Sequence, residues 1–385
     1  MSASEEYQSR PFRASSIPQP YIPVDNTWSF GIGLKPPPQP SSLLESPPQK
    51  SFLDPEGDLC LQVGESPATS FIVCSRTLAR ASLVWNVMLN GEFKESKRFR
   101  SREEPVDLPE DDPRPMALLL NIIHGRFDRV PSYDCVMNIR DLYDISVVTD
   151  KYDMAHVLRP WASGWLRSTH RLNKWPHLSL REQYCHERLW IYWELGDKVN
   201  FEKIANGLLL NSSTLTEDAD SLRCKEAQEP PDIYEILEQT RLSIIEELLT
   251  ALDNIIQGLI QKDKRFCSKK SKKESQKGQG DCLASMLGTG IQSLYGVGLW
   301  PLPQPASVQC SVLDLSAKLK TVEIEGYIGE YHRCSQKLSL QNKVEGILRN
   351  IPSLLTEGHK SHLESQAKKS GVSPIGSDTL FNHGI

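Results

Sequence analysis

Three cysteines and one histidine in the second half of the chain are the residues whose types best suit a metal ion. They are Cys267, Cys282, His332 and Cys334. Thiolates and an imidazole are the ligands that tetrahedral zinc takes in proteins, and the ordered elements predicted between these residues can bring them together. Their spacings match no standard zinc finger, so ordinary buried or unused thiols are the alternative. The sequence therefore predicts either a structural zinc site or no cofactor at all.

A run of lysines is the second chemically distinctive stretch. Residues 262–277 hold eight basic side chains and only two acidic ones. Within the run, Lys269, Lys270, Lys272 and Lys273 form the cluster that would serve as a nuclear import signal, whereas a solvated linker would show the same composition. No aromatic platform accompanies the lysines, so we expect no nucleic-acid partner.

The chain carries no recognisable catalytic motif. There is no Ser-His-Asp elbow, GxxxxGK loop, HExxH or GxGxxG, which leaves acyl transfer and phosphate chemistry without a basis. His124 lies beside Gly125 at the end of a predicted helix, where a structural or solvated histidine is a simpler interpretation than a general base. We therefore expect no enzymatic activity.

Composition and cysteine usage indicate an intracellular protein. The 385 residues carry a net charge of −5, which gives no reason to expect a membrane or nucleic acid, and the nine scattered cysteines favour a reducing compartment. The polar, acidic start of the chain predicts no secretory leader, and the longest apolar run is too short to span a membrane. We expect a cytoplasmic or nuclear location, or both.

Proline and charge patterns divide the chain into segments. Ten of the 26 prolines lie in the first fifty residues, which is typical of a disordered arm. The predicted organisation is a Pro-rich arm (1–51), an α+β domain (52–170), a helical extension (171–261), a basic linker (262–280), a helical C-terminal region (281–370) and a flexible tail (371–385).

The elements of the α+β domain are organised around the stretch 105–125. Val106 and Leu108 alternate with polar residues as a short strand, Asp112 caps the following helix, and Gly125 ends it. Two β-rich runs before it, 58–64 and 69–74, predict a hairpin. After the hairpin, one helical face is predicted from the spacing of Leu78, Ser82, Trp85 and Met88.

Helices are predicted for most of the remaining chain. They are indicated around residues 139–152, around Val157, Trp161 and Trp165, in two short pieces within 186–210 with Asp197 as a cap, and at several places within 281–370. The longest begins at Asp232, where apolar residues recur at spacings of 4, 7, 4, 7 and 4 up to Leu259. That stripe predicts either a partner helix or packing against 186–210.

These residues resemble a known family. Residues 54–168 resemble a BTB (POZ) domain, a small sheet with a helical cluster. The resemblance rests on Asp58, on Leu78, Ser82, Trp85 and Met88, on the segment 91–96, on Leu108-Pro109-Glu110-Asp111-Asp112-Pro113 and on 149–154. The amino-acid sequences of segments 74–82 and 121–127 are most similar to those of the filamentous-fungal branch of the BTB family. The fold class is thus α+β: a BTB domain, then an all-α extension and a helical C-terminal region.

The resemblance implies a protein that works by contacting other proteins. Phe93 and Glu95 match the hydrophobic-x-Glu element with which some BTB adaptors bind cullin-3, and Tyr143 joins them as a predicted partner-binding residue. A solvated loop that packs Phe93 on its own domain is the alternative. The expected function is a non-enzymatic adaptor or scaffold, serving a cullin-3 ubiquitin ligase or associating with itself. The second hypothesis is a nuclear regulatory protein related to transcription or chromatin.

Overall fold

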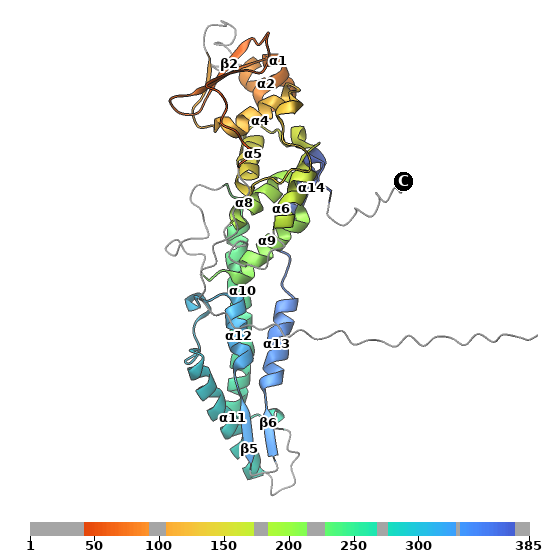
Figure 1. Ribbon diagram of the computed structural model, residues 1–385. Coiled ribbons are helices and arrows are strands. Elements are labelled where there is room, and N and C mark those ends of the chain that lie inside the picture. The colour runs from red at the N-terminus through yellow and green to blue at the C-terminus, as the bar shows by residue number, and fades with distance from the viewer. Residues whose placement is uncertain are drawn as a thin grey trace, which may run out of the picture. The chain divides into compact units, whose positions relative to one another are not determined.

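The structure is a computed structural model that describes residues 42–91, 105–172, 184–213, 228–267, 276–328 and 332–373. All of them belong to one compact unit. They form a mixed α+β protein that is mostly helical, with one sheet near the start of the described chain and a second near its C-terminal end (Figure 1). The α+β class predicted from the sequence is confirmed at this level.

The first sheet has four strands in the order β1–β3–β2–β4. They are β1 (Lys50–Phe52), β2 (Leu59–Val63), β3 (Thr69–Val73) and β4 (Val106–Leu108). The predicted hairpin is the antiparallel pair β2–β3, in which Leu61 lies opposite Phe71, while β4 runs parallel to β2. Alternate residues of β2, β3 and β4 are buried, because successive side chains of a strand point to opposite faces.

Order begins earlier than the sequence indicates. The arm was expected to extend to residue 51 and the first ordered element to start at Asp58, whereas β1 pairs in parallel with β3 and Leu44 is buried. The amino-acid composition does not predict where order begins, because β1 is held in the sheet by main-chain hydrogen bonds and not by its side chains. The Ser70 N–H, for example, donates to the Gln49 carbonyl at 2.8 Å.

The helical face predicted through Ser82 is two helices. α1 (Ser75–Ala81) ends at Ser82, and α2 (Leu83–Asn90) begins after it. The Ser82 hydroxyl accepts the Trp85 N–H and donates to the Tyr152 carbonyl at 2.6 Å. A serine with this double role caps a helix and fixes it to a distant element, so the chain turns at this residue.

Helix α4 (Pro113–Ile123) follows the sequence rules closely. The Asp112 carboxylate accepts the Arg114 N–H as N-cap, and Gly125 has a φ of +71° just beyond the helix. The predicted apolar stripe is buried, with Met116 and Leu119 fully inaccessible. This helix therefore supplies much of the core beneath the sheet, as its periodicity predicts.

Polar contacts connect several of the segments on which the family resemblance rests. The Asp58 carboxylate accepts both the N–H and the hydroxyl of Ser75 at 2.8 Å. Asp111 accepts the Tyr152 hydroxyl at 2.5 Å and the Lys151 ammonium at 2.7 Å. Tyr152 also stacks on Trp85 at 4.6 Å between ring centroids. These carboxylates join loops far apart in the sequence.

The domain ends with α5 (Ile139–Lys151), a short 3-10 turn η2 (Ala155–Leu158) and α6 (Ala162–Leu172). The one helix expected to contain Val157, Trp161 and Trp165 is therefore divided, with Pro160 between the two pieces. Proline lacks the N–H that a continuing helix would need at this position.

The helical extension matches its prediction in outline. α8 (Cys185–Leu195) and α9 (Lys198–Asn211) are separated by Gly196, and the Asp197 carboxylate caps α9 by accepting the Asn200 N–H. α10 (Ile233–Ile260) buries its whole predicted stripe. The stripe is covered from within the chain, because α10 packs against α9, α11, α12 and α13 (Figure 1).

The C-terminal region contains an unpredicted hairpin. Its helices are α11 (Gln276–Gly296), α12 (Val312–Thr321), α13 (Lys337–Arg349) and α14 (Glu357–Ser370), and its strands are β5 (Glu325–Ile328) and β6 (His332–Ser335). The region was expected to be helical throughout. β5 and β6 are four residues each and largely polar, and β5 packs along α11, so a tertiary contact decides their conformation.

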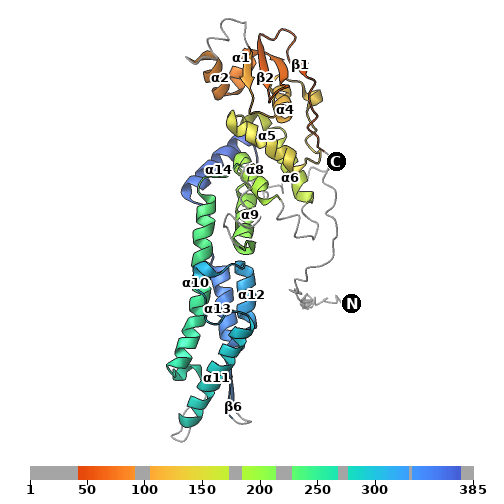
Figure 2. The same ribbon diagram turned by 90° about the vertical axis from the view of Figure 1, so that its left-hand side faces the viewer.

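Helix α14 returns to the N-terminal part of the described chain and lies beside α8 (Figure 2). The Ser370 hydroxyl donates to the Leu195 carbonyl at 2.6 Å, and the Gln366 amide donates to the Glu194 carboxylate at 2.7 Å. Buried side chains thus connect the end of the described chain to the helices that follow the α+β domain.

Candidate metal centre

The four predicted zinc ligands come together in the structure. One ligand atom from each of Cys267, Cys282, His332 and Cys334 lies within 4.8 Å of every other. The His332 Nε2 is 3.2 Å from the sulfurs of both Cys267 and Cys334, and those two sulfurs are 3.9 Å apart. All eight cysteines that the structure describes are free thiols, so no disulfide competes for these sulfurs.

These separations suit a tetrahedral ion. With zinc–sulfur bonds of about 2.3 Å and zinc–nitrogen bonds of about 2.0–2.1 Å, two sulfurs of one site lie about 3.8 Å apart and a sulfur and a nitrogen about 3.6 Å apart. The three thiols are buried, and the imidazole is partly exposed. A Cys₃His set of this size is a complete donor set for zinc.

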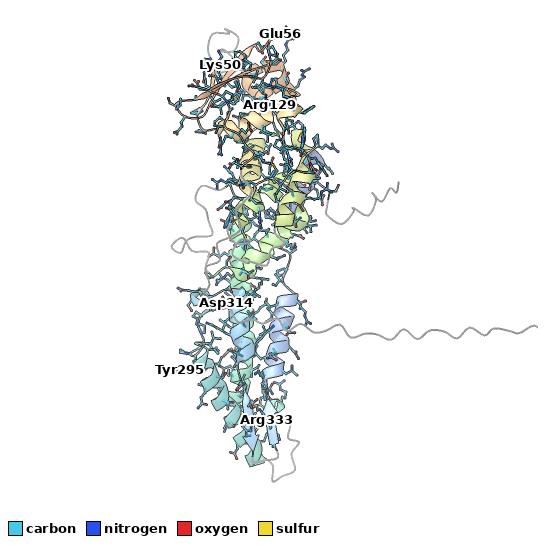
Figure 3. All side chains as sticks on the ribbon, viewed as in Figure 1. Lys50, Glu56, Arg129, Tyr295, Asp314 and Arg333 are labelled. Carbon is cyan, nitrogen blue, oxygen red and sulfur yellow. The ribbon has the colours of Figure 1, made fainter. Side chains whose placement is uncertain are left out.

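Three separate elements position the ligands. Cys267 follows the 3-10 turn η3 (Lys264–Phe266), Cys282 lies in α11, and His332 and Cys334 are on β6. Because residues i and i+2 of a strand share a face, His332 and Cys334 point to the same side. Arg333 between them, labelled in Figure 3, is exposed and pairs instead with Glu325 at 2.7 Å.

Gly326 allows the hairpin to approach α11. A Cβ at Gly326, which pairs with Cys334, would lie 2.6 Å from both the carbonyl oxygen and the sulfur of Cys282. The neighbouring Glu325 is fixed to α11 as well, because its N–H donates to the Thr289 hydroxyl at 2.9 Å. The cluster therefore depends on a residue without a side chain at this one position.

The turn that carries Cys267 is anchored at its start and beside its last residue. The Asp263 carboxylate caps η3 by accepting the Arg265 N–H, and the Asp263 N–H donates to the Gly258 carbonyl at the end of α10. The Gln336 amide, just after β6, donates to the Phe266 carbonyl at 3.1 Å. These bonds bring Cys267 close to β6.

Burial and the neighbouring thiols control the protonation of the free cluster. Desolvation, together with the sulfurs of Cys267 and Cys334, raises the pKa of the Cys282 thiol to about 12. Without a cation, the Cys282 thiol therefore favours its neutral form. A divalent ion would reverse this preference, because it binds thiolates and displaces their protons.

Of the other predicted site residues, only Tyr143 lies in the part of the chain that the structure describes. Phe93 and Glu95, and the four lysines Lys269, Lys270, Lys272 and Lys273, lie outside the described residues. Tyr143 is buried, and its hydroxyl accepts the Gln228 N–H at 2.8 Å, which leaves it little surface to offer a partner. Burial raises the pKa of that phenol.

His124 has a structural environment. Its Nε2 accepts the Cys74 N–H at 3.1 Å, and its Nδ1 lies 2.8 Å from the Leu120 carbonyl, so the proton belongs on Nδ1. Desolvation lowers the pKa of the imidazole. A neutral histidine with both nitrogens bonded to the backbone joins the sheet to the end of α4.

Sequence reasoning missed several buried polar groups. Asp141 and Glu194 are both almost completely buried, and the Arg241 guanidinium donates to the carbonyls of Ser213, Val308 and Cys310 at 2.5 to 3.0 Å. Each interrupts the apolar face of a helix. That interruption could have identified these groups from the sequence, because a charged residue at a core position requires a partner.

Among the described residues, no helix has the length and apolar character needed to cross a membrane. Comparisons of the chain with models of protein families, with curated proteins and with solved structures give no match.

Proposed function

We propose that the chain is a non-enzymatic interaction protein, an adaptor or scaffold, whose C-terminal region is held together by a structural zinc ion. The proposal of a zinc ion is supported by the convergence of four ligand residues from three elements: Cys267, Cys282, His332 and Cys334. Such a cluster of buried thiols has no evident packing advantage over apolar side chains. Four donors within one ion's reach are what zinc requires.

The completeness of the donor set supports a structural role for the metal. Catalytic zinc sites keep an open position for water or substrate and use three protein ligands, whereas structural sites use four. All four donors here come from the protein. The ion would join η3, α11 and β6, and so would stabilise the far end of α10 and α11.

Metal analysis of purified protein tests the zinc proposal. The wild type and a Cys310→Ser control should hold about one zinc per chain, whereas Cys282→Ser should hold much less. Cys310 is a suitable control because it is a described free cysteine outside the cluster. Wild-type protein without zinc, with all four ligands open to thiol and imidazole reagents, would end the proposal.

The interaction part rests on the α+β domain. Its hairpin, strand β4 and apolar helix α4 follow the order on which the BTB resemblance rests, with α1 and α2 in place of the single helix expected after the hairpin. In addition, α2 carries Leu83, Val84 and Val87 as exposed side chains, with Leu83 68% accessible. No residue of the described chain covers them. An apolar helix surface of this kind, just before Phe93 and Glu95, supports docking of another protein.

Affinity purification tests the adaptor role. We expect cullin-3 to be recovered with the wild-type chain and to be lost with Phe93→Ala and with Glu95→Ala, since an apolar anchor and a carboxylate at its rim supply the contact. Phe127→Ala is a matched control, because Phe127 is an exposed phenylalanine elsewhere on the same domain. Equal recovery with all four proteins would remove the ligase hypothesis.

A further inference from the structure

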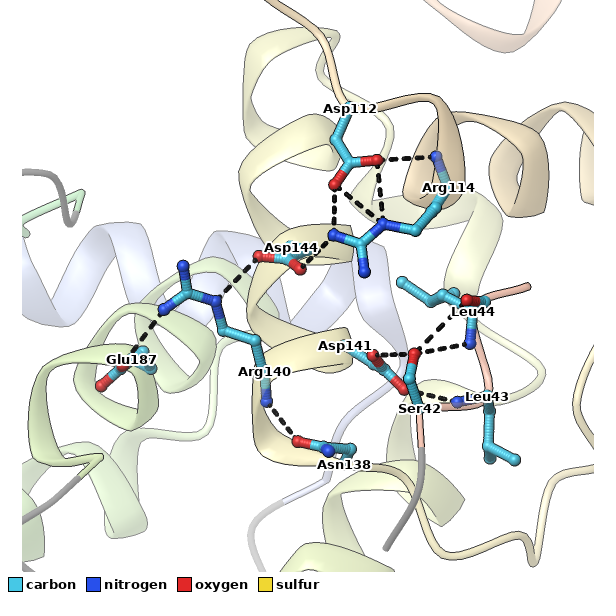
Figure 4. A network of polar contacts seen from close by, with 10 residues as sticks. All are labelled: Ser42, Leu43, Leu44, Asp112, Arg114, Asn138, Arg140, Asp141, Asp144 and Glu187. Carbon is cyan, nitrogen blue, oxygen red and sulfur yellow. Dashed lines mark hydrogen bonds and ion pairs between the residues drawn. The ribbon is translucent and has the colours of Figure 1, made fainter. Parts of the chain in front are cut away.

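Residues 42–53 lie in an extended form across the edge of the first sheet and the start of α5. At one end, the Ser42 hydroxyl and the Leu43 N–H donate to the two carboxylate oxygens of Asp141, each at 2.7 Å (Figure 4). Asp141 is only 2% exposed. A buried carboxylate on α5 thus recognises one hydroxyl and one backbone N–H.

At the other end, the segment is bound through its main chain. β1 pairs in parallel with β3, and the Leu53 N–H donates to the Ile72 carbonyl at 2.9 Å. The side chains of β1 are exposed or half-buried, with Phe52 57% exposed. Main-chain pairing of this kind places little demand on the side chains of the added strand.

Between its two ends the segment packs poorly. Leu44 and Leu53 are buried and join the core. The residues between them, including Pro47 and Pro48, line an open cavity of about 590 Å³ together with Ala117 and Asn121 of α4. The segment is therefore held by two leucines, by the Asp141 carboxylate, by a short strand and by the Arg126 guanidinium, which donates to the Phe52 carbonyl at 2.7 Å, and open space borders its middle.

We infer that the surface formed by the β3 edge, Asp141 and this cavity is a docking groove for an extended peptide, and that residues 42–53 are its resident ligand within the chain. The competing occupant is an extended segment of a partner protein with a hydroxyl side chain, a leucine two residues later, and a strand-forming end. Such a partner can fill the cavity that the resident segment leaves open. This inference rests on the proposed interaction function and adds a partner class to it.

The contacts that residues 42–53 make with this surface favour a partner segment of the kind described. Peptide capture at a sheet edge takes its affinity from main-chain bonds and its selectivity from pockets for a few side chains, and both are present here. The carboxylate selects a residue that can donate a hydrogen bond, and it disfavours an acidic side chain at that position. The Leu44 pocket selects a large apolar residue.

A labelled synthetic peptide of residues 40–54 tests the groove by fluorescence anisotropy on the full chain. In Leu44→Asp, the resident segment loses its anchor while Asp141, the β3 edge and the α4 side of the cavity are unchanged, so the peptide should bind about tenfold more tightly than to the wild type, whose own segment competes. Adding Asp141→Ala to Leu44→Asp should abolish the gain. Adding Asp107→Ala, an exposed carboxylate on β4, should preserve it.

A second variant keeps the test valid if Leu44→Asp does not fold. Leu43→Pro removes the N–H that Asp141 accepts, and Leu43 is exposed, so the core is not disturbed. A folded Leu44→Asp or Leu43→Pro chain that fails to bind the peptide would overturn the inference. A wild-type dimer that the peptide dissociates would also overturn it, because a second copy would then be the occupant. Zinc content and cullin-3 recovery, measured on the same variants, report separately on the proposed function.

Discussion

Replacing Glu194 with glutamine should stabilise the chain at neutral pH and flatten the pH dependence of its stability. Glu194 is 1% exposed on α8, and its carboxylate accepts the Gln366 amide N–H at 2.7 Å. Burial, and then the charge of Asp150, raises the pKa of Glu194 to about 8. The Gln366 amide oxygen is buried and has no partner among the described residues, so it offers an acceptor for the proton of a neutral Glu194.

The size of the effect follows from proton uptake on folding. An ordinary glutamate has a pKa near 4.5, so between that value and about 8 the folded chain holds a proton that the unfolded chain has released. The stabilisation is complete at low pH and is lost as the pH rises through the folded pKa. One pKa unit corresponds to about 1.4 kcal/mol, so the free energy of unfolding should fall by about 3 kcal/mol between roughly pH 5 and pH 7.5.

Urea unfolding followed by circular dichroism measures this difference. Over that pH range, wild type should lose about 3 kcal/mol relative to Glu194→Gln, because the variant carries a neutral side chain at every pH. Comparing the two proteins cancels the other titrating groups. Glu364→Gln, which changes an exposed carboxylate on the same helix as Gln366, should behave as the wild type. Parallel curves for wild type and Glu194→Gln would refute the argument.

Four further substitutions have defined outcomes. Gly326→Ala should reduce the zinc content of the purified chain, because its Cβ would lie 2.6 Å from the Cys282 backbone oxygen, whereas Gly346→Ala meets no atom within 4 Å and should not. Arg241→Met should lower the free energy of unfolding in urea by about 3 kcal/mol, since three carbonyls lose their donor. Tyr152→Phe should cost about 2 kcal/mol in the same assay through its lost bond to Asp111. Leu119→Asp should abolish the cooperative thermal transition of the domain, because it places a charge at a fully buried position.

Local signals in the sequence predict the elements that are determined locally. Asp112 and Gly125 mark the two ends of α4 because a cap and a positive φ are properties of a few neighbouring residues. Asp197 marks the start of α9 for the same reason. The stripe on α10 correctly predicts a buried face, but several helices of the chain could have covered it, so the spacing does not identify its partners.

Elements that depend on distant contacts could not be predicted in the same way. Ser82 fits a helical face, but it caps α2 and its hydroxyl donates to the distant Tyr152 carbonyl, so it lies at a break between two helices. The strands β5 and β6 are short and polar, so their conformation follows from packing on α11. The metal ligands could be chosen by type but not by spacing, because they come from a turn, a helix and a strand.

The proposed metal centre and the proposed docking groove share one physical property, which bears on how the chain would be regulated. Each orders a segment whose own composition favours disorder: the Pro-rich residues before β2, and the polar hairpin between α12 and α13. A segment of this kind gains its order from a few long-range contacts, so its stability is set by the ligand that makes them. For the hairpin that ligand is the proposed zinc ion, which four donors would hold and which would add to the packing of β5 on α11. For residues 42–53 it is Asp141 and a strand edge, which a competing peptide can reach, so the groove is the better placed of the two to respond to a partner.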